Sequence, residues 1–181
     1  MSNQQRKTFK SVQDWHSFID DLKQRVSAGE VVNVDPAAFR VNCYRDIESL
    51  RKRPLLVYAA KFICPVLPGT PNSIDLGDVD GFTDLINSIP KEHKKVDVII
   101  HSPGGQPDAT ERIVYLLRNR FEEVHFLIPH SAYSAATMLA LSGDSITLHT
   151  SATLGPIDPH KWYSGPVNQE RICIVSRCRP A

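Results

Sequence analysis

The sequence predicts a protein of the α/β class, with a mostly parallel sheet, covering helices and an N-terminal helical extension. Two observations support this prediction. From Pro54 onward, short apolar runs alternate with segments of helical periodicity, which is typical of βαβ units. The runs VDVIIH (96–101) and EVHFLI (123–128) are short and largely apolar, as expected of parallel strands buried on both faces.

Residues 1–53 are predicted to form the N-terminal helical extension. Within 11–29, apolar residues recur at helical spacing: Val12, Trp15, Phe18, Ile19, Leu22 and Val26. Ser11 and Asp14 have the spacing of a capping box, and Gly29 is expected to end the helix. The remainder of the extension is predicted to be a connecting segment with one short helix. Nothing in it indicates chemistry, so we expect a packing or partner-binding role.

Residues 54–165 are predicted to form the main domain. The expected elements are strands at 55–63, 96–101, 123–128 and 145–149, and helices at 80–89, 107–121 and 134–143. In the helix at 107–121, Asp108 is the expected N-cap, and the expected buried stripe is Ile113, Val114, Leu116 and Leu117. Residues 166–181 lack a helical pattern and are interpreted as a divergent or truncated C-terminal tail.

Composition excludes several classes of function. The chain has 181 residues and a formal net charge of +1, so no bulk field recruits nucleic acid or an acidic membrane. No apolar run is long enough for a membrane span, and the N-terminus lacks the apolar segment of a signal peptide, so we expect a cytoplasmic protein. The four cysteines include no CxxC pair and are expected to be reduced and free of metal. No cofactor is predicted.

Two glycines stand between a predicted strand and a predicted helix, in the run HSPGGQPD. Glycine permits a positive φ and lets another molecule approach the backbone closely. The loop could therefore cradle a phosphate, or its amides could stabilise an oxyanion during acyl transfer. The phosphate interpretation is weak because GxGxxG, GxxxxGK[ST] and nearby Lys or Arg are all missing. A tight turn without a ligand is the third interpretation.

The next strand-to-helix connection has a different composition. In IPHSAYSAATMLALSGD the predicted helix begins among small residues, and Ser134 lies at its N-terminus. The positive end of the helix dipole favours an alkoxide there. A serine at a helix start is commonly a cap, but a glycine loop followed by such a serine is a more specific combination. The pair predicts a nucleophile with its oxyanion-binding amides.

The motifs HSPGG, PHSAYSAATMLALSGD and ATLGPIDP, in this order, resemble the Clp-protease and crotonase superfamily. The sequence is most similar to the serine dehydrogenase proteinase family, a branch of the Clp-class serine peptidases related to signal peptide peptidase A. The resemblance covers roughly residues 55–159. It implies a spiral of ββα units, assembled into rings or stacked oligomers. It further implies that Gly104 and Gly105 line the oxyanion hole, that Ser134 is the nucleophile and that the Ala135 amide is a second oxyanion donor.

The sequence departs from that family in two places. Relatives often have two glycines after the nucleophile, where this chain has Ala135 and Ala136, although an alanine amide still donates a hydrogen bond. Membrane-bound relatives use a lysine as general base, on a segment well after the LGP turn. Lys161 is the single lysine after Ser134, and the arginines near the end of the chain stay protonated. The sequence leaves open whether its end is truncated, frameshifted or divergent.

The general base therefore has several candidates. These are Lys161 and His160, then His101 or His130, and the further alternative is that this chain contains no base. Asp158 could orient the base or bind the substrate backbone, or could be only a turn residue.

The sequence thus predicts a serine peptidase that acts on peptides or proteins through an acyl-enzyme at Ser134, without metal or nucleotide. We expect a homo-oligomer. One alternative is a truncated, inactive homologue that serves as a binding or structural subunit. A second alternative is a crotonase-type acyl-CoA enzyme, which would share the oxyanion geometry.

Overall fold

The structure of the protein is a computed structural model that describes residues 11–32, 36–63, 65 and 67–157, and the backbone of 160–163 and 172–175. The chain forms two compact units, Met1–Lys52 and Arg53–Ala181. No helix in the described part of the chain is both long and apolar enough to cross a bilayer.

The first unit contains two helices, α1 (Val12–Ser27) and α2 (Pro36–Arg51). The predicted capping box of α1 is confirmed, because the Asp14 amide donates to Ser11 Oγ and the Ser11 amide donates to the Asp14 carboxylate, both at 3.1 Å. The prediction of one short helix in the connecting segment was wrong, since α2 runs for 16 residues. Its apolar side chains are spread around the helix, which conceals the periodicity.

A small aromatic cluster joins these two helices. The ring centroids of Phe18 and Phe39 lie 5.5 Å apart, and that of Trp15 lies 5.9 Å from Phe18 and 6.5 Å from Phe39. These separations are within the range of favourable aromatic packing.

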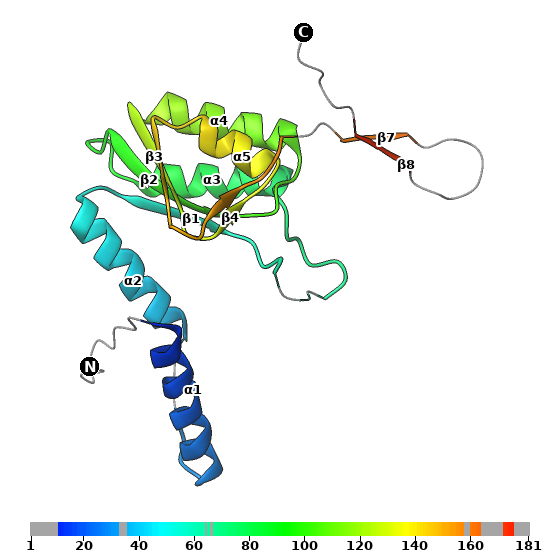
Figure 1. Cartoon of the computed structure of the whole chain (residues 1–181). Helices are drawn as coiled ribbons and strands as arrows, with labels where there is room; N and C mark the ends of the chain where they lie inside the picture. Colours follow the sequence, from blue (N-terminus) through cyan, green and yellow to red (C-terminus); the bar gives the residue numbers. More distant parts are fainter. Residues whose placement is uncertain are drawn as a thin grey trace. The chain divides into compact units, whose positions relative to one another are not determined.

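The second unit is built on a four-stranded sheet, in agreement with the predicted α/β class (Figure 1). Its strand order is β1-β2-β3-β5, and all neighbours are parallel. The bounds are β1 (Leu55–Ala59), β2 (Lys95–His101), β3 (Glu123–Ile128) and β5 (Ser145–Leu148). The first strand ends four residues earlier than predicted. Its last contact with β2 is a hydrogen bond of 2.8 Å from the Ala60 amide to the His101 carbonyl.

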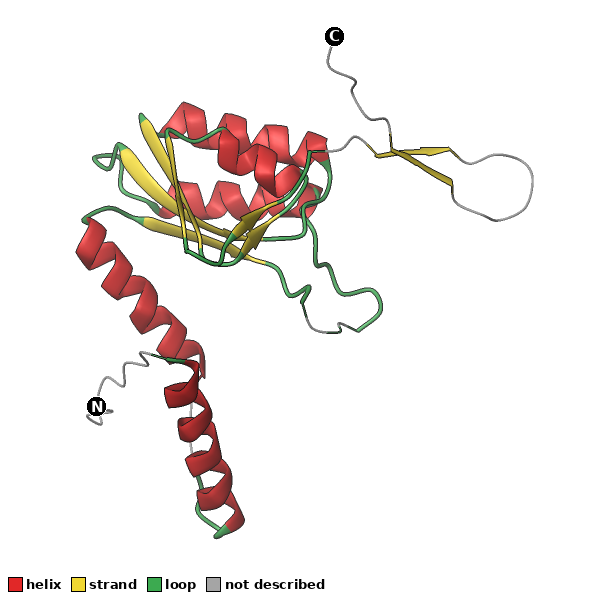
Figure 2. Ribbon diagram, in the orientation of Figure 1, coloured by secondary structure: helices red, strands yellow, loops and turns green. Residues whose placement is uncertain are grey.

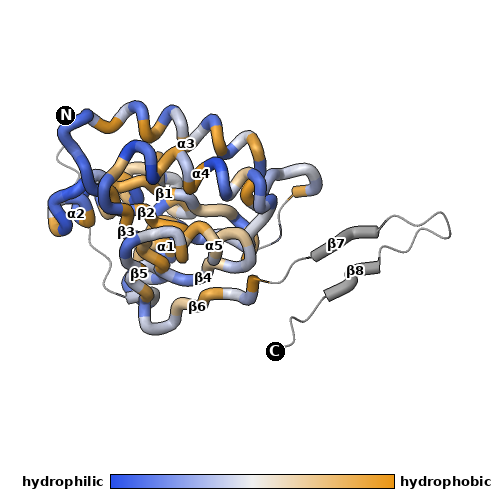
Figure 3. Tube along the Cα trace, turned by 90° about the horizontal axis from the view of Figure 1, so that it is seen from above, coloured by the Kyte–Doolittle hydropathy of each residue, from blue (hydrophilic) through white to orange (hydrophobic). Residues whose placement is uncertain are grey.

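Three helices cover one face of this sheet, as Figure 2 shows. They are α3 (Leu76–Ser88), α4 (Pro107–Arg120) and α5 (Ala135–Leu141). Side chains from alternate strand positions fill the core beneath them, among them Val98, Ile100 and Phe126. In Figure 3, α5 is hydrophobic over most of its length, as its composition requires.

The prediction that the strands are buried on both faces holds for part of β2, where Val96, Asp97 and Val98 are all buried, but not for β3. Along β3, buried and half-buried residues alternate, because the three helices pack against the same face. The apolar residues on the other face, such as Leu127, are half-buried. Alternation with period two is the expected pattern for a sheet covered on one side.

Helix α3 begins earlier than predicted, and helix α4 begins at the predicted residue but with a different N-cap. Helix α3 begins at Leu76 instead of residue 80, because Asp75 and Asp78 form a capping box that the sequence analysis did not recognise. Helix α4 begins at Pro107 with Gln106 as its N-cap, so the assignment of Asp108 as N-cap was wrong. Proline has a preset φ and no N–H, and therefore suits the first helical position.

Two further pairs of strands lie outside the main sheet. Strand β4 (Ser131–Ala132) pairs in parallel with β6 (Thr153–Leu154), a pairing that the sequence analysis missed because each strand is two residues long. Strand β7 (His160–Tyr163) pairs antiparallel with β8 (Ile172–Val175).

Candidate active site

Residues 102–106, here called the glycine loop, follow β2, and residues 129–134, here called the serine turn, follow β3. The two segments lie against each other at the carboxyl ends of these strands. The Ser102 amide donates to the Ser131 carbonyl at 3.1 Å, and the Tyr133 amide donates to the Ser102 carbonyl at 3.0 Å. A parallel bridge between Ser102 and Ala132 completes this contact. Ligands commonly bind α/β folds at this edge of the sheet, so the two sequence motifs meet where chemistry is expected.

The backbone of the glycine loop excludes other residues at two successive positions. Gly104 has a φ of 103° and Gly105 a φ of 153°, both in the region that side chains rarely adopt. A Cβ on Gly105 would lie 2.1 Å from the Ile74 carbonyl oxygen. A Cβ on Gly104 would lie 2.6 Å from the Tyr133 carbonyl oxygen and 2.8 Å from Ser134 Cβ. Gly105 therefore allows close contact with the chain before α3, and Gly104 allows close contact with the serine turn.

The amides of the loop differ in their hydrogen bonds. The Gly104 amide is buried and donates to Ser102 Oγ at 3.1 Å. Within the described part of the chain, neither the Gly105 amide nor the Ala135 amide has an acceptor. The Ala135 amide belongs to the first turn of α5, where helical N–H groups have no partner in the helix. Two donors are thus available beside the serine turn.

Ser134 has a strained backbone. Its φ of 50° and ψ of −120° place a non-glycine residue in a conformation that β-carbons disfavour. Its side chain does not cap α5, and no side chain among the described residues is hydrogen-bonded to its hydroxyl. The predicted position at the helix N-terminus is confirmed, and the half-buried hydroxyl is left available for chemistry.

Two histidines lie near these motifs. The His101 and His130 rings pack with centroids 5.5 Å apart, and Phe62 stacks on His101 at 4.7 Å. Burial lowers the pKa of His101, and the charge of His130 lowers it further. The Nδ1 atom of His101 is buried and has no partner among the described residues, while His130 Nδ1 bonds to Ser131 Oγ. Neither imidazole is hydrogen-bonded to Ser134.

The structure brings four predicted site residues together, namely Gly104, Gly105, Ser134 and Ala135. Asp158 lies outside the described residues. The backbone of His160 and Lys161 belongs to β7, but their side chains lie outside the described part of the structure.

Sequence analysis missed two contributors to the glycine loop. The first is Ser102, whose hydroxyl accepts the Gly104 amide. The second is Ile74, which accepts the Gln106 amide at 2.8 Å and donates its own amide to the Gly104 carbonyl at 2.7 Å. The serine of the SPGG motif was a visible signal for Ser102, whereas nothing local marks Ile74.

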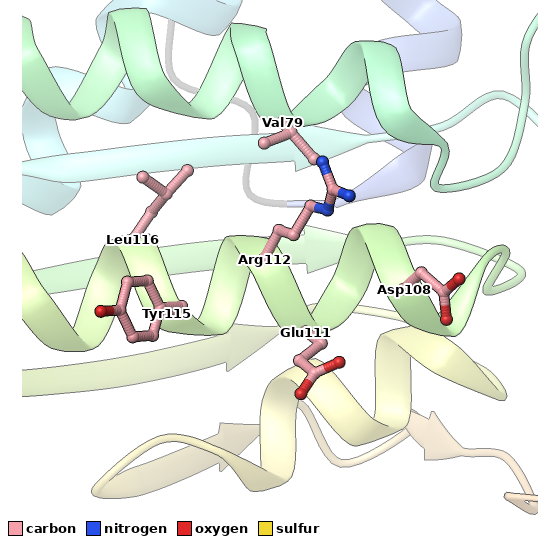
Figure 4. A pocket seen from close by; sticks show the side chains of 6 residues that line it. All are labelled: Val79, Asp108, Glu111, Arg112, Tyr115 and Leu116. Carbon is pink, nitrogen blue, oxygen red and sulfur yellow. The ribbon is translucent and has the colours of Figure 1, made fainter.

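A groove of about 560 Å³ lies elsewhere, between α3 and α4 (Figure 4). Its lining consists of Val79, Asp108, Glu111, Arg112, Tyr115 and Leu116. In Figure 4, the Arg112 side chain extends from α4 toward Val79 on α3. Since the glycine loop and the serine turn contribute no lining residue, this groove is not part of the candidate active site. Within the described residues, no group of three or more His, Cys, Asp or Glu side chains could hold a metal ion.

The parallel sheet, the glycine loop and the strained serine at a helix start define the class of Clp-like α/β serine peptidases. Residues 33–167 match the family described as ClpP-like SDH-type serine proteinases, and the chain belongs to that family. The resemblance inferred from the sequence motifs is therefore confirmed.

Two curated proteins of Methanocaldococcus jannaschii are similar to the chain. Uncharacterized protein MJ1495 is 31% identical over 122 residues, which cover 66% of this chain and 41% of that protein. Uncharacterized protein MJ0137 is 37% identical over 86 residues, which cover 48% of this chain and 30% of that protein. The chain thus spans less than half the length of these relatives.

A solved structure supports the fold. A variant of the 1510-N membrane-bound stomatin-specific protease superposes with a TM-score of 0.51 at 20% identity. The match covers 69% of this chain and 56% of that protein. At this identity the likeness establishes the fold alone.

Proposed function

We propose that the protein is a serine peptidase in which Ser134 attacks the carbonyl carbon of a peptide bond. The observation that carries this proposal is the strained turn at Ser134 beside the amides of Gly105 and Ala135, which have no acceptor among the described residues. A serine with ordinary backbone dihedrals would commonly cap the helix with its side chain. Here the side chain makes no cap.

The reaction would proceed through an acyl-enzyme. As Ser134 Oγ bonds to the carbonyl carbon, its proton passes to a base, and the carbonyl oxygen becomes an oxyanion. The Gly105 and Ala135 amides would bind that oxyanion, an interaction whose loss elsewhere reduces turnover about a hundred- to a thousandfold. When the tetrahedral intermediate collapses, the base returns the proton to the leaving amine. Water then attacks the acyl carbon and its proton passes to the base. Collapse of this second intermediate breaks the ester bond, the acid product leaves, and the base returns the proton to Ser134 Oγ.

Gly104 has a different part in this proposal. Its amide already donates to Ser102 Oγ and is therefore not proposed to bind the oxyanion. Its part is steric. The lack of a Cβ at this position allows the Tyr133 carbonyl and Ser134 to approach the loop.

The base is proposed to come from His160 or Lys161, both on β7. A lysine would need its pKa lowered by burial to accept a proton near neutrality. General-base assistance typically contributes about a hundred- to ten-thousandfold in rate. If neither residue reaches Ser134, the chain should be a weak peptidase, and Asp158 would then have no base to orient.

The test is covalent labelling with a fluorophosphonate probe, followed by mass spectrometry of the labelled peptide. We expect one adduct, on Ser134, and no adduct in S134A. In an active serine peptidase, loss of the nucleophile reduces turnover by about a millionfold. A folded wild-type chain that takes up no probe would contradict the proposal, and would favour an inactive binding subunit or an acyl-CoA enzyme.

We further propose peptide or protein substrates and a homo-oligomeric assembly, which rest on the family and not on a contact within the structure. Light scattering coupled to gel filtration tests the second point. A monomer at micromolar concentration would argue against it.

A further inference from the structure

We propose that Ser102 is a positioning residue that decides which amide of the glycine loop is available to the oxyanion. This inference rests on the proposed peptidase function. Its structural basis, however, can be tested without any activity.

The first step of the argument concerns the side chain of Ser102. This residue is fully buried, and its hydroxyl oxygen accepts the Gly104 amide at 3.1 Å. The two glycines present successive amides, and both could in principle turn toward a substrate carbonyl. With the Gly104 amide bound, the Gly105 amide remains without an acceptor among the described residues.

The second step concerns the backbone of Ser102, which connects the loop to the nucleophile. Its amide donates to the Ser131 carbonyl, and its carbonyl accepts the Tyr133 amide at 3.0 Å. Tyr133 directly precedes Ser134. Ser102 therefore contacts both halves of the site, the loop through its hydroxyl and the serine turn through its main chain.

The third step concerns the opposite side of the loop, where Ile74 pairs with Gly105. Ile74 precedes Asp75, whose amide donates to Asp78 Oδ2 at 2.9 Å. The same carboxylate oxygen accepts the Tyr58 hydroxyl at 3.0 Å. Burial raises the pKa of Tyr58, the Asp78 charge raises it further, and a smaller opposing effect comes from the Ser102 hydroxyl.

These contacts hold the glycine loop on both sides. Among the residues that make them, Ser102 is the one whose side-chain hydroxyl accepts a hydrogen bond from a glycine amide of the loop. In S102A the buried Gly104 amide would lose its acceptor, and a buried amide without a partner is unfavourable. The loop would then rotate to satisfy it, which would displace the Gly105 amide from the oxyanion. Small displacements of catalytic groups reduce rates strongly.

The first experiment measures amide hydrogen exchange at single residues in the full chain. In the wild type we expect slow exchange at Gly104 and fast exchange at Gly105. In S102A the protection of Gly104 should fall at least about tenfold, while S102T should retain it. The matched control is S142A at the far end of α5, a half-buried serine whose hydroxyl donates to the Leu139 carbonyl and not to the loop. Unchanged Gly104 protection in S102A would overturn the proposal, whether or not the chain is an enzyme.

The second experiment measures the kinetics of fluorophosphonate labelling at Ser134. We expect the maximal labelling rate to fall about ten- to a hundredfold in S102A, with little change in the probe concentration at half-saturation, because binding does not require the oxyanion. S102T should recover most of the rate, and S142A should match the wild type. Equal maximal rates in S102A and the wild type would overturn the positioning role. A wild-type chain that is never labelled would count against the proposed function, and the exchange experiment would still decide the role of Ser102.

Discussion

The two strand-to-helix connections of the candidate site have unusual backbones for different reasons. After β2, the chain uses Gly104 and Gly105, for which a positive φ carries no steric penalty. After β3, the chain places Ser134 at a φ of 50°, where a β-carbon is strained. The first connection contributes backbone only, whereas the second must present a hydroxyl.

This difference shows where the fold accepts backbone strain and where it avoids it. Where amides alone are needed, glycine adopts the required conformation freely. Where a side chain is needed, the backbone strain remains, and hydrogen bonds from the surrounding structure must offset it. Here the Ala136 amide donates to the Tyr133 carbonyl, and the Thr137 and Met138 amides donate to the Ser134 carbonyl. Strained dihedrals at functional sites commonly have this origin.

The largest effect is expected from a side chain in the first connection. In G105A the new Cβ would meet the Ile74 backbone at 2.1 Å, and backbone atoms cannot move aside as a flexible side chain can. We expect a loss of about 3 kcal/mol in the free energy of unfolding, from the clash and the positive φ together. Urea denaturation followed by circular dichroism measures it.

The matched control for this substitution is G81A, in the exposed part of α3. A Cβ there meets nothing within 4 Å, and alanine favours helix by about 1 kcal/mol over glycine. This variant should be as stable as the wild type or more so. If G105A were equally stable, the close approach of Ile74 to the loop would not exist.

A smaller effect, again with glycine more stable than alanine, is expected in the second connection. S134G should be more stable than S134A by about 1 kcal/mol, because alanine retains the strained β-carbon and glycine does not. Both variants should fail to react with the fluorophosphonate probe. The free energy of unfolding of the two variants, measured side by side, tests the strain without reference to activity.

Ser142, the C-cap of α5, provides the reference pair. It has ordinary helical dihedrals, with φ of −75°. At that position the alanine variant should be more stable than the glycine variant, since glycine loses more conformational freedom on folding. The same order at both positions would mean that Ser134 is not strained.

Sequence patterns were sufficient for the parts of the fold that depend on local chemistry. The strand at residues 123–128 and the cap of α1 were predicted and are confirmed, because a short apolar run and a capping box are contained in a few adjacent residues. The motifs also indicated the correct family.

Contacts between distant segments could not be predicted in this way. The approach of Ile74 to Gly105, and the pairing of Ser131 with Thr153, join residues that no local pattern connects. The hydrogen bond from the Gly104 amide to Ser102 Oγ likewise requires the folded geometry of the loop. The base stays a prediction, since the side chains of His160 and Lys161 lie outside the described residues.

The smallest expected effect is a pH dependence of the free energy of unfolding. It comes from His101 and His130, which lie at the start of the two connections. Burial and the charge of His130 lower the pKa of His101, so the folded state resists protonation more than the unfolded state does. Between the ordinary histidine pKa, about 6.5, and the lower value in the folded protein, the unfolded state binds more protons. Stability is therefore fully present above about pH 7 and decreases as the pH falls through that interval.

We expect the wild type to lose more free energy of unfolding between pH 7.5 and pH 5.5 than H101N does, by less than about 1 kcal/mol, since water screens a half-exposed ring. In H130N the difference should be smaller than in the wild type, because one of the two causes of the lowered pKa is removed while burial remains. Other titrating groups are common to all three proteins and cancel in the comparison. Denaturation curves at the two pH values provide the measurement. Parallel pH dependences in the wild type and H101N would show that the pKa of His101 is not lowered in the folded protein, and a dependence in H130N equal to that of the wild type would assign the lowered pKa to burial alone.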